Sequence, residues 1–287
     1  MKQFCPFWLG LAFLLGPVGA QAQVETDFVS AIPQPTVATE FDSLVWSDEF
    51  NGEGDIHHGK WFYQTQLPSW GVWFGGLLNH YTNRTENAYV KDGSLYLTAK
   101  RETFKDQGYT KEFTSARLNA KFAFTYGRVE VRAKVPEGIG TWPAIWMLSK
   151  NISEAGAFWE IKGYGTTSWP HCGEIDIMEH WGKNPNYVQS AVHTTSSYGS
   201  EVKNLGGKKI ENASTEFHLY ALEWSEEKMV FSVDDKVIYT YEPKVKDQTT
   251  WPFDTDQYLI MNIAIEKDID PAFKESAMVV DYVRVFQ

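Results

Sequence analysis

The 287-residue sequence has little cysteine and no apolar run long enough to cross a membrane. Its two cysteines are Cys5 and Cys172. Residues 1–22 combine Lys2, a short apolar core and an Ala-Gln-Ala cleavage site, which together predict a signal peptide and a secreted, periplasmic or extracellular protein. Removal of this peptide leaves one thiol, which excludes an intramolecular disulfide, so that stability has to come from an apolar core.

Positive charge is also scarce, with 26 lysines and arginines against 37 aspartates and glutamates and a net charge of −11. Loss of Lys2 with the signal peptide makes the chain one unit more negative. This balance argues against nucleic acid or an anionic membrane surface as a partner. We expect a soluble monomer that binds a neutral ligand.

Long amphipathic helical patterns are missing, and short strand-like runs separated by turn signals take their place. These runs are Ser94–Lys100, Gly127–Lys134, Leu219–Trp224, Met229–Val233 and Val279–Phe286. Gly127–Val135 alternates apolar and charged residues and predicts a half-exposed antiparallel strand, and Val233–Val237 predicts a hairpin turn. The pattern indicates an all-β sandwich or barrel over residues 41–287, preceded by a flexible lead-in at residues 23–40.

The run Glu174-Ile175-Asp176-Ile177-Met178-Glu179 places three carboxylates among apolar side chains. Alternate residues of a strand share a face, so Glu174 and Asp176 point the same way and Glu179 is one residue out of phase. A β-bulge at Ile177 or Met178 would return Glu179 to the face of the other two acids. Buried carboxylates are costly unless they are paired or have a task. A ladder of this kind suits glycosidic bond cleavage, which uses one carboxylate as nucleophile or base and another as proton donor.

Two kinds of metal site are alternatives to a catalytic site. Three acids could bind calcium through oxygen ligands, but calcium prefers ligands that converge from turns over those of a straight strand. Zinc is a second alternative, because histidine and cysteine side chains lie close in sequence at His171, Cys172, His180 and His193. The sequence lacks the C-x-x-C pair and the H-E-x-x-H helix that usually mark zinc sites, so catalysis is the favoured interpretation.

The acid run resembles the E-x-D-x-x-E signature of glycoside hydrolase family 16, in the form found in laminarinases. Further segments resemble the family in its order, namely Trp46–Phe50, Thr114–Leu118, Tyr126–Glu130, Gly140–Leu148, Val192–Thr194 and Asp281–Val285. The resemblance covers residues 41 to 287. It implies a concanavalin-like β-jelly-roll sandwich with a substrate cleft across its concave sheet, and no cofactor for catalysis.

The resemblance also implies roles for individual residues. Glu174 would be the nucleophile, Glu179 the acid and base, and Asp176 would lie between them and raise the pKa of a neighbouring glutamic acid. Indole rings stack on sugar rings. The implied sugar contacts are Trp142, Trp146 and Trp181, with Arg117, His193 and Asn79 as lesser candidates. Glu49, Gly93 and Asp281 match positions that bind a structural calcium in many members of the family.

Two loops depart from the family pattern. Trp70–Thr82 is longer and more aromatic than the corresponding stretch of laminarinases, and Glu266-Lys267 stands where relatives often carry Gly-Gly. Within the longer loop, Trp70 and Trp73 are equally compatible with the cleft and with packing at the surface. Both loops border the binding groove in the family, so the preferred linkage stays open.

The predicted function is a retaining endo-β-glucanase that acts on β-1,3-glucan or mixed β-1,3/1,4-glucan. One alternative is the same chemistry on a galactan such as agarose, porphyran or carrageenan. A second alternative is a lectin-like glycan-binding module on the same sandwich, without turnover.

Overall fold

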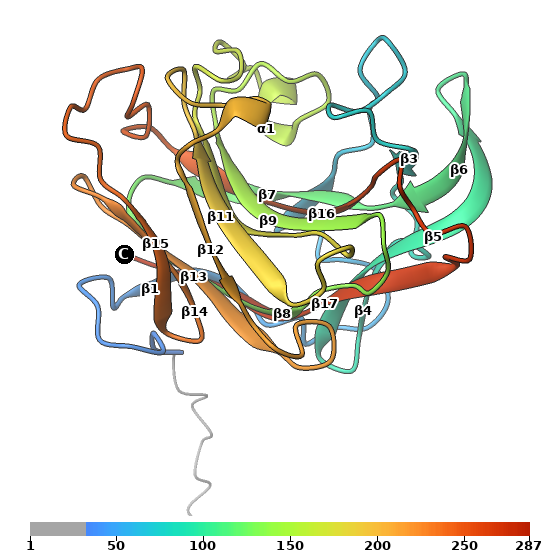
Figure 1. Cartoon of the computed structure of the whole chain (residues 1–287), viewed down its shortest axis with the longest axis horizontal. Coiled ribbons are helices and arrows are strands. Elements are labelled where there is room, and N and C mark those ends of the chain that lie inside the picture. Colours follow the sequence, from blue (N-terminus) through green and yellow to red (C-terminus); the bar gives the residue numbers. More distant parts are fainter. Residues whose placement is uncertain (1–32) are drawn as a thin grey trace, which may run out of the picture. The chain divides into compact units, whose positions relative to one another are not determined.

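A computed structural model describes residues 33–287, and within that range the chain folds into two packed β-sheets (Figure 1). The first sheet has ten strands, and eight of them follow the order β15 (Lys236–Tyr241), β14 (Met229–Val233), β13 (His218–Trp224), β8 (Gly127–Lys134), β17 (Glu275–Phe286), β5 (Ser94–Asp106), β6 (Tyr109–Ser115), β3 (Asn79–Tyr81). The remaining two are β1 (Leu44–Asp48), which pairs with β17, and β4 (Ala88–Lys91), which pairs with β5.

The second sheet has seven strands in the order β12 (Leu205–Lys209), β11 (Tyr187–His193), β10 (Glu174–His180), β9 (Thr141–Ser149), β16 (Gln257–Ile265), β7 (Arg117–Phe124), β2 (Trp61–Tyr63). Helical structure in residues 33–287 is limited to α1 (Phe158–Ile161) and the 3₁₀ turn Gly199–Glu201. None of the helices in this range is long and apolar enough to span a membrane. The two antiparallel-dominated sheets confirm the predicted all-β jelly-roll sandwich.

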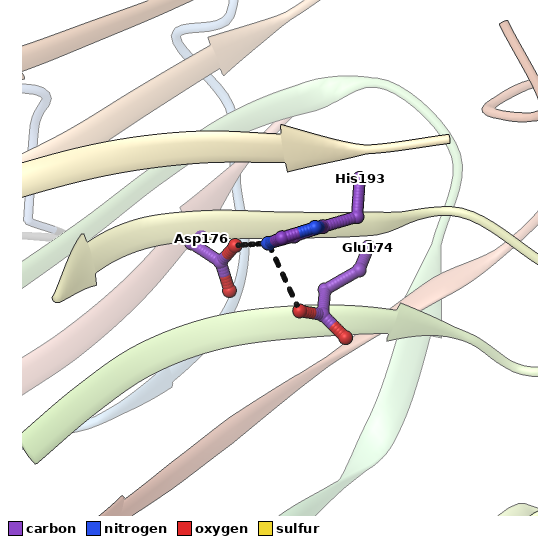
Figure 2. A group of neighbouring side chains, drawn as sticks. All are labelled: Glu174, Asp176 and His193. Carbon is purple, nitrogen blue, oxygen red and sulfur yellow. Dashed lines mark ion pairs between the residues drawn. The ribbon is translucent and has the colours of Figure 1, made fainter. Parts of the chain in front are cut away.

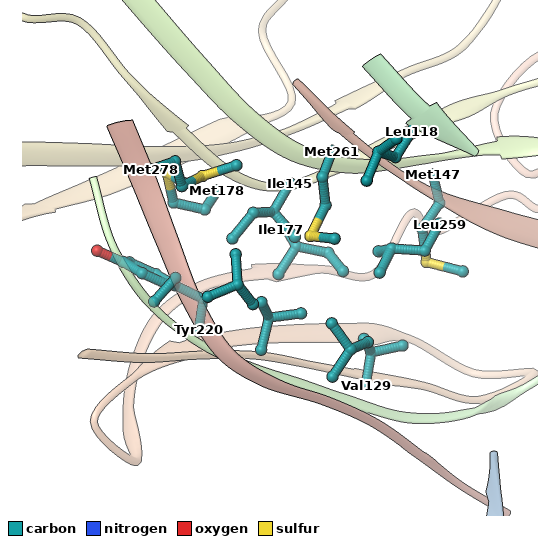
Figure 3. Packing of buried hydrophobic residues seen from close by; sticks show 14 of the residues in the cluster. Leu118, Val129, Ile145, Met147, Ile177, Met178, Tyr220, Leu259, Met261 and Met278 are labelled. Atoms are coloured by element: carbon teal, nitrogen blue, oxygen red, sulfur yellow. The ribbon is translucent and has the colours of Figure 1, made fainter. Parts of the chain in front are cut away.

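The inner faces of the two sheets form one apolar core (Figure 3). Ile145 and Met147 of β9 and Met261 of β16 come from the seven-stranded sheet, and Val129 and Tyr220 come from the ten-stranded sheet. All five side chains are almost completely buried. A chain with a single cysteine in its described part therefore obtains its cohesion from apolar burial, as the sequence predicts.

All five predicted strand runs are strands, and the predicted hairpin joins β14 to β15 with Asp234 and Asp235 at positive φ. The expectation of a half-exposed strand at Gly127–Val135 was wrong, because Arg128 and Glu130 are buried. Arg128 pairs with Glu130 at 2.8 Å, and Thr36 covers the pair by donating its backbone N–H and its hydroxyl to Glu130.

Residues 1–22, the predicted signal peptide, and residues 23–32 of the predicted lead-in lie outside the described residues.

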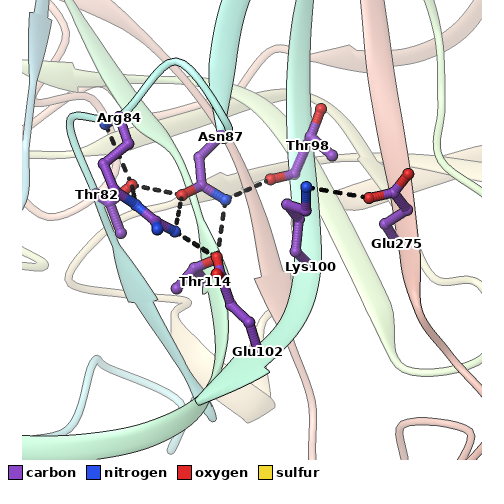
Figure 4. Close-up of polar contacts among 8 residues, drawn as sticks. All are labelled: Thr82, Arg84, Asn87, Thr98, Lys100, Glu102, Thr114 and Glu275. Carbon is purple, nitrogen blue, oxygen red and sulfur yellow. Dashed lines mark hydrogen bonds and ion pairs between the residues drawn. The ribbon is translucent and has the colours of Figure 1, made fainter. Parts of the chain in front are cut away.

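On the ten-stranded sheet, a polar network ties the turn after β3 to the neighbouring strands (Figure 4). Asn87 donates to the carbonyl of Thr98 on β5 and to the hydroxyl of Thr114 on β6, each at 3.0 Å. Arg84 pairs with Glu102, and the same guanidinium contacts Asn87. These contacts fix the position at which the chain leaves β3. Strand β3 lies within the Trp70–Thr82 stretch, which is rich in aromatic residues.

Candidate active site

Strand β10 contains the predicted bulge. Asp176 pairs with Ala191 of β11, and the next pair along the two strands is Glu179 with Gln189. Two residues of β10 therefore oppose one residue of β11, Ser190, whose hydroxyl donates to the carbonyl of Ile177 at 2.8 Å. The bulge prediction is confirmed, and the serine hydroxyl satisfies a carbonyl that the interrupted ladder leaves free.

The bulge sorts the side chains of β10 between two environments. Ile177 and Met178, although adjacent, both belong to the apolar core between the sheets. Glu179 returns to the outer face of the seven-stranded sheet, where Glu174 and Asp176 also lie, and all three carboxylates line one cavity. Without the extra residue, Glu179 would point into the core as an unpaired charge.

The cavity has a volume of about 690 Å³ and is lined mainly by apolar and aromatic side chains. It collects eight of the nine residues predicted as catalytic or sugar-binding, namely Glu174, Asp176, Glu179, Trp142, Trp146, Trp181, Arg117 and His193. These residues come from β7, β9, β10, β11 and the turn after β10. Segments that are far apart in the sequence therefore converge on one site.

Each of the two glutamates accepts a hydrogen bond from an indole N–H. Trp142 donates to Oε1 of Glu179 at 3.1 Å, and Trp169 donates to Oε2 of Glu174 at 3.0 Å. Donors of this kind orient a carboxylate and favour its ionised form. Trp169 was missed by the sequence analysis, although its position five residues before Glu174 was a usable signal.

His193 lies between two of the acids (Figure 2). Its Nε2 is 3.2 Å from Oδ2 of Asp176 and 3.6 Å from Oε1 of Glu174. The backbone N–H of Gly199 donates to Nδ1 of His193 at 3.1 Å, so in the neutral ring the proton is on Nε2 and faces the carboxylates. The 3.2 Å contact is misaligned for a hydrogen bond, and Oδ2 of Asp176 has no hydrogen-bond partner.

The three carboxylates all have raised pKa values. Desolvation by burial is the main cause for each, and it raises the pKa of both Asp176 and Glu179 to about 8. The charge of Asp176 adds to the rise at Glu179 and at Glu174, whereas the nearby His193 lowers both pKa values. Acids packed this closely share protons, so protonation of one of them favours ionisation of a neighbour.

The tryptophans form the walls of the cavity. Trp142 and Trp181 are stacked, with ring centroids 5.6 Å apart and an interplanar angle of 23°. Trp146 donates to Oδ1 of Asn262 at 2.7 Å, and the guanidinium of Arg117 lies 4.9 Å from the centre of its ring. Arg117 is fixed in turn by an ion pair with Glu154 at 2.8 Å. Flat, oriented aromatic walls of this kind suit the apolar faces of sugar rings.

Asn79 requires a correction. The structure places it outside the cavity lining, completely buried, with its Oδ1 accepting the backbone N–H of Ile265 at 3.0 Å. It therefore ties β3 to the end of β16, and it has no surface through which it could contact a sugar. The short side chain of Asn79 is occupied by a backbone donor that its position in the sequence does not reveal.

Two of the predicted calcium residues are engaged by arginines. Glu49 holds Arg284 through both carboxylate oxygens at 3.0 and 2.8 Å, and Asp281 pairs with Arg132 at 2.5 Å. Calcium needs oxygen ligands directed at one point, and here each carboxylate is directed at a guanidinium. The carboxylates of Glu49 and Asp281 are thus occupied by guanidinium groups, and calcium at Glu49, Gly93 and Asp281 stays a prediction of the resemblance.

Among residues 33–287, one group of acids and histidines has ligand atoms close enough together for a metal ion, all within 4.8 Å of one another. It consists of Glu174, Asp176 and His193, which are part of the carboxylate site itself. Cys172, the thiol nearest to this group in sequence, is buried, and burial raises the pKa of the thiol to about 12. A thiolate is the form that binds zinc, so the environment of Cys172 disfavours that role.

A sandwich whose aromatic cleft holds a bulged strand of three acids defines a glycoside hydrolase. Comparison with known proteins agrees, because the model of glycosyl hydrolases family 16 matches residues 78–284. The chain belongs to glycoside hydrolase family 16. It is 40% identical over 260 residues to a beta-glucanase from Rhodothermus marinus, and the match covers 85% of each protein.

A solved structure of a LamA variant from Zobellia galactanivorans, in complex with laminaritriose and laminaritetraose, has a similar fold. Its TM-score is 0.79 at 43% identity, and the match covers 86% of this chain and 100% of that one. A keratan-sulfate endo-1,4-beta-galactosidase from Sphingobacterium multivorum is 31% identical over 277 residues, which span 94% of this chain and 60% of that protein.

Proposed function

We propose that this chain is a secreted endo-β-glucanase that hydrolyses β-1,3-glucan, with mixed β-1,3/1,4-glucan as a further substrate and retention of the anomeric configuration. One observation carries the proposal. Glu174 and Glu179 share the face of one bulged strand, inside an aromatic cavity, and each accepts an indole N–H. The similarity to a beta-glucanase and to a protein solved with laminarin oligosaccharides supports glucan as the substrate.

In the first step, Glu174 attacks the anomeric carbon while Glu179 gives its proton to the glycosidic oxygen that leaves. A pKa of about 8 keeps Glu179 protonated at neutral pH, as a proton donor requires. Glu174 has to be ionised for attack. The hydrogen bond from Trp169 and the nearby His193 both act in that direction.

In the second step, Glu179, now ionised, takes a proton from a water molecule, which attacks the anomeric carbon and releases Glu174. Asp176 lies close to both glutamates in this proposal. Its negative charge opposes a second charge on Glu179, which favours the protonated form of Glu179 before the first step.

Endo action requires a groove that continues past the carboxylates. The stacked pair Trp142 and Trp181 lines the same cavity as Trp146. Several sugar units would therefore bind at once. The net charge of −11 favours a neutral polymer over a sulfated one.

The test combines reducing-sugar release with viscosity on laminarin and barley glucan. We expect viscosity to fall early and oligosaccharides to accumulate, and proton NMR to detect the β-anomer as the first product. A matched Glu174→Gln variant controls for contaminating activity. Steady release of glucose at constant viscosity would contradict endo action, and α-anomer as the first product would contradict retention.

A galactan substrate is the second candidate, because the keratan-sulfate endo-1,4-beta-galactosidase is also a relative. Agarose, porphyran, carrageenan and keratan sulfate belong in the same assay panel. Turnover of one of these polymers at a rate above that on laminarin would transfer the same mechanism to a galactan. Binding of laminarin without any turnover would instead favour a lectin-like module.

Secretion rests on residues 1–22 alone, with their apolar core and cleavage site. Expression of the full chain in a bacterial host, followed by N-terminal sequencing of the exported protein, tests this part of the proposal. We expect the mature protein to begin at Gln23. Retention of the whole chain in the cytoplasm would contradict it.

A further inference from the structure

The loop between β2 and β3 exposes two large aromatic side chains beside the cavity. Trp70 is 60% exposed and Phe74 is 58% exposed, and their ring centroids are 5.5 Å apart with an interplanar angle of 72°. Exposed aromatic rings leave a large apolar surface in water, which is unfavourable unless a ligand covers it. We call this pair the loop aromatic pair.

The loop that carries the pair is anchored. Trp73, between the two exposed rings, is only 2% exposed and packs edge to face on Tyr81 at 4.9 Å. Trp73 and Leu77 form an isolated bridge, and the N–H of Leu78 donates to the carbonyl of Ile265 at 2.9 Å. The loop therefore presents the pair from a fixed base, so that ligand binding needs little ordering of the backbone.

Two glycines let the loop lie close to neighbouring aromatic rings. Gly71 has φ +79°, and a Cβ at this position would lie 2.2 Å from the ring of Tyr109. Gly75 has φ +80°, and a Cβ there would be 3.7 Å from the ring of Trp142. The loop is thus held between Tyr109 on one side and the wall of the cavity on the other.

The loop aromatic pair continues the cavity. Phe74 itself lines the cavity, whereas Trp70 lies beyond its lining. Aromatic surface extends from Trp181 to Trp142 and then, across Gly75, to Phe74 and Trp70. A polymer that fills the cavity and leaves it on this side reaches the pair next, and its sugar rings can stack on indole and phenyl faces.

From this geometry we infer that Trp70 and Phe74 form a distal binding site for β-1,3-linked glucan, outside the sugar positions next to Glu174 and Glu179. The angle of 72° between the rings favours this linkage. Successive sugar faces turn along a coiling β-1,3 chain, whereas a β-1,4 chain is a flat ribbon. This inference rests on the proposed function and adds a second contact region for the same polymer.

The test measures binding by calorimetry with the full mature chain made inactive by Glu174→Gln. In that background, Trp70→Ala is compared with Tyr89→Ala, a substitution of a partly buried tyrosine that stacks on Tyr96 at the edge of the ten-stranded sheet. The probes are laminaritetraose, a long laminarin fraction and a long cello-oligosaccharide.

We expect Trp70→Ala to weaken binding of the long laminarin by about 5- to 10-fold, the low end of the loss seen when an aromatic stacking partner is truncated. Binding of laminaritetraose and the melting temperature stay within error of the parent, and Tyr89→Ala leaves the affinity for laminaritetraose and for long laminarin unchanged. An equal loss for short and long ligands would overturn the inference, because the ring would then act inside the cavity or on its shape.

Two further outcomes also contradict the inference. Equal affinity of the parent and Trp70→Ala for long laminarin means that the ring contacts no sugar. A concentration-dependent dimer that Trp70→Ala abolishes, seen by analytical ultracentrifugation, means that a second copy of the chain covers the pair. Failure of the active enzyme to hydrolyse laminarin would instead contradict the proposed function, which the binding assay does not depend on.

Discussion

Two groups of acids in this sandwich have opposite electrostatic surroundings. On the ten-stranded sheet, the acids of β8 and β17 and the adjoining Glu49 are matched by lysine or arginine, as in Arg128 with Glu130 and Arg284 with Glu49. On the seven-stranded sheet, three acids share one face of β10, and no lysine or arginine of residues 33–287 pairs with them. Loss of one partner of a buried matched pair destabilises a fold, whereas like charges held close together raise each other's pKa values, as at many active sites.

The largest effect should come from the unmatched acids. We expect Glu174→Ala and Glu179→Ala each to lower kcat by about a thousandfold or more while polymer binding is largely kept, because both groups act on charge that develops in the transition state. Steady-state kinetics and calorimetry on laminarin measure the two quantities. A folded variant with turnover near that of the parent would reject the assigned roles.

Breaking the matched pair should lower the stability of the fold. Arg128→Met leaves Glu130 buried without its counter-charge, and we expect the free energy of unfolding to fall by about 3 to 5 kcal/mol. Urea unfolding measures the loss. The control is Arg132→Met, which breaks a half-exposed pair with Asp281 and should cost less than about 1 kcal/mol. Equal losses for the two variants would show that burial does not distinguish these pairs.

Asp176→Asn should increase stability at alkaline pH. The folded carboxyl has a pKa of about 8 against an ordinary value of 3.8, so the folded state binds the proton more tightly. The contribution of this group to stability therefore falls as the pH rises from about 4 to about 8. The amide removes that fall, and we expect a gain of roughly 1 to 3 kcal/mol at pH 8 that shrinks towards pH 4.

Denaturant unfolding at several pH values checks the expectation, with Asp254→Asn as an exposed control. Catalytic activity should fall in Asp176→Asn, since a stabilised active site commonly loses function. A loss of stability at pH 8 would mean that the contact of ionised Asp176 with His193 outweighs the cost of burying that charge.

Trp142→Ala tests whether the aromatic wall of the cavity binds sugar. The ring stacks on Trp181 and is partly exposed, so we expect oligosaccharide affinity to fall by about 1 to 3 kcal/mol, as for other aromatic stacking partners. Trp46→Ala is the matched control, because Trp46 packs on Trp61 and Phe122. It should lower the melting temperature and leave the affinity unchanged. The opposite pattern would make Trp142 a core residue.

The smallest effect should be a shift of the alkaline limb of the pH profile. Activity falls as the pH rises through about 8, because Glu179 then loses the proton that it gives to the leaving oxygen. The indole N–H of Trp142 lowers the pKa of Glu179, and Trp142→Phe removes this donor while it keeps an aromatic ring. The limb should move to higher pH by a fraction of a unit. An unchanged alkaline limb would mean that ionisation of Glu179 does not cause the loss of activity at high pH.

The sequence by itself determined the all-β class, the positions of several strands and the identity of the acid ladder. The bulge could be predicted because Glu179 is out of phase with Glu174 and Asp176 in an apolar strand, and a carboxylate in the core is prohibitively costly. Patterns of period two record which face each residue takes, so local sequence carries this information.

Only the tertiary structure decided what each polar side chain contacts. Arg128 and Glu130 alternate with apolar residues like surface charges, yet they pair in a buried site under Thr36. Asn79 satisfies the backbone of Ile265 instead of a sugar, and Trp169 reaches Glu174 from the preceding loop. These contacts depend on which strands are neighbours and on how loops return to them. Sequence periodicity fixes a residue's face, but it cannot specify a partner supplied by a distant segment.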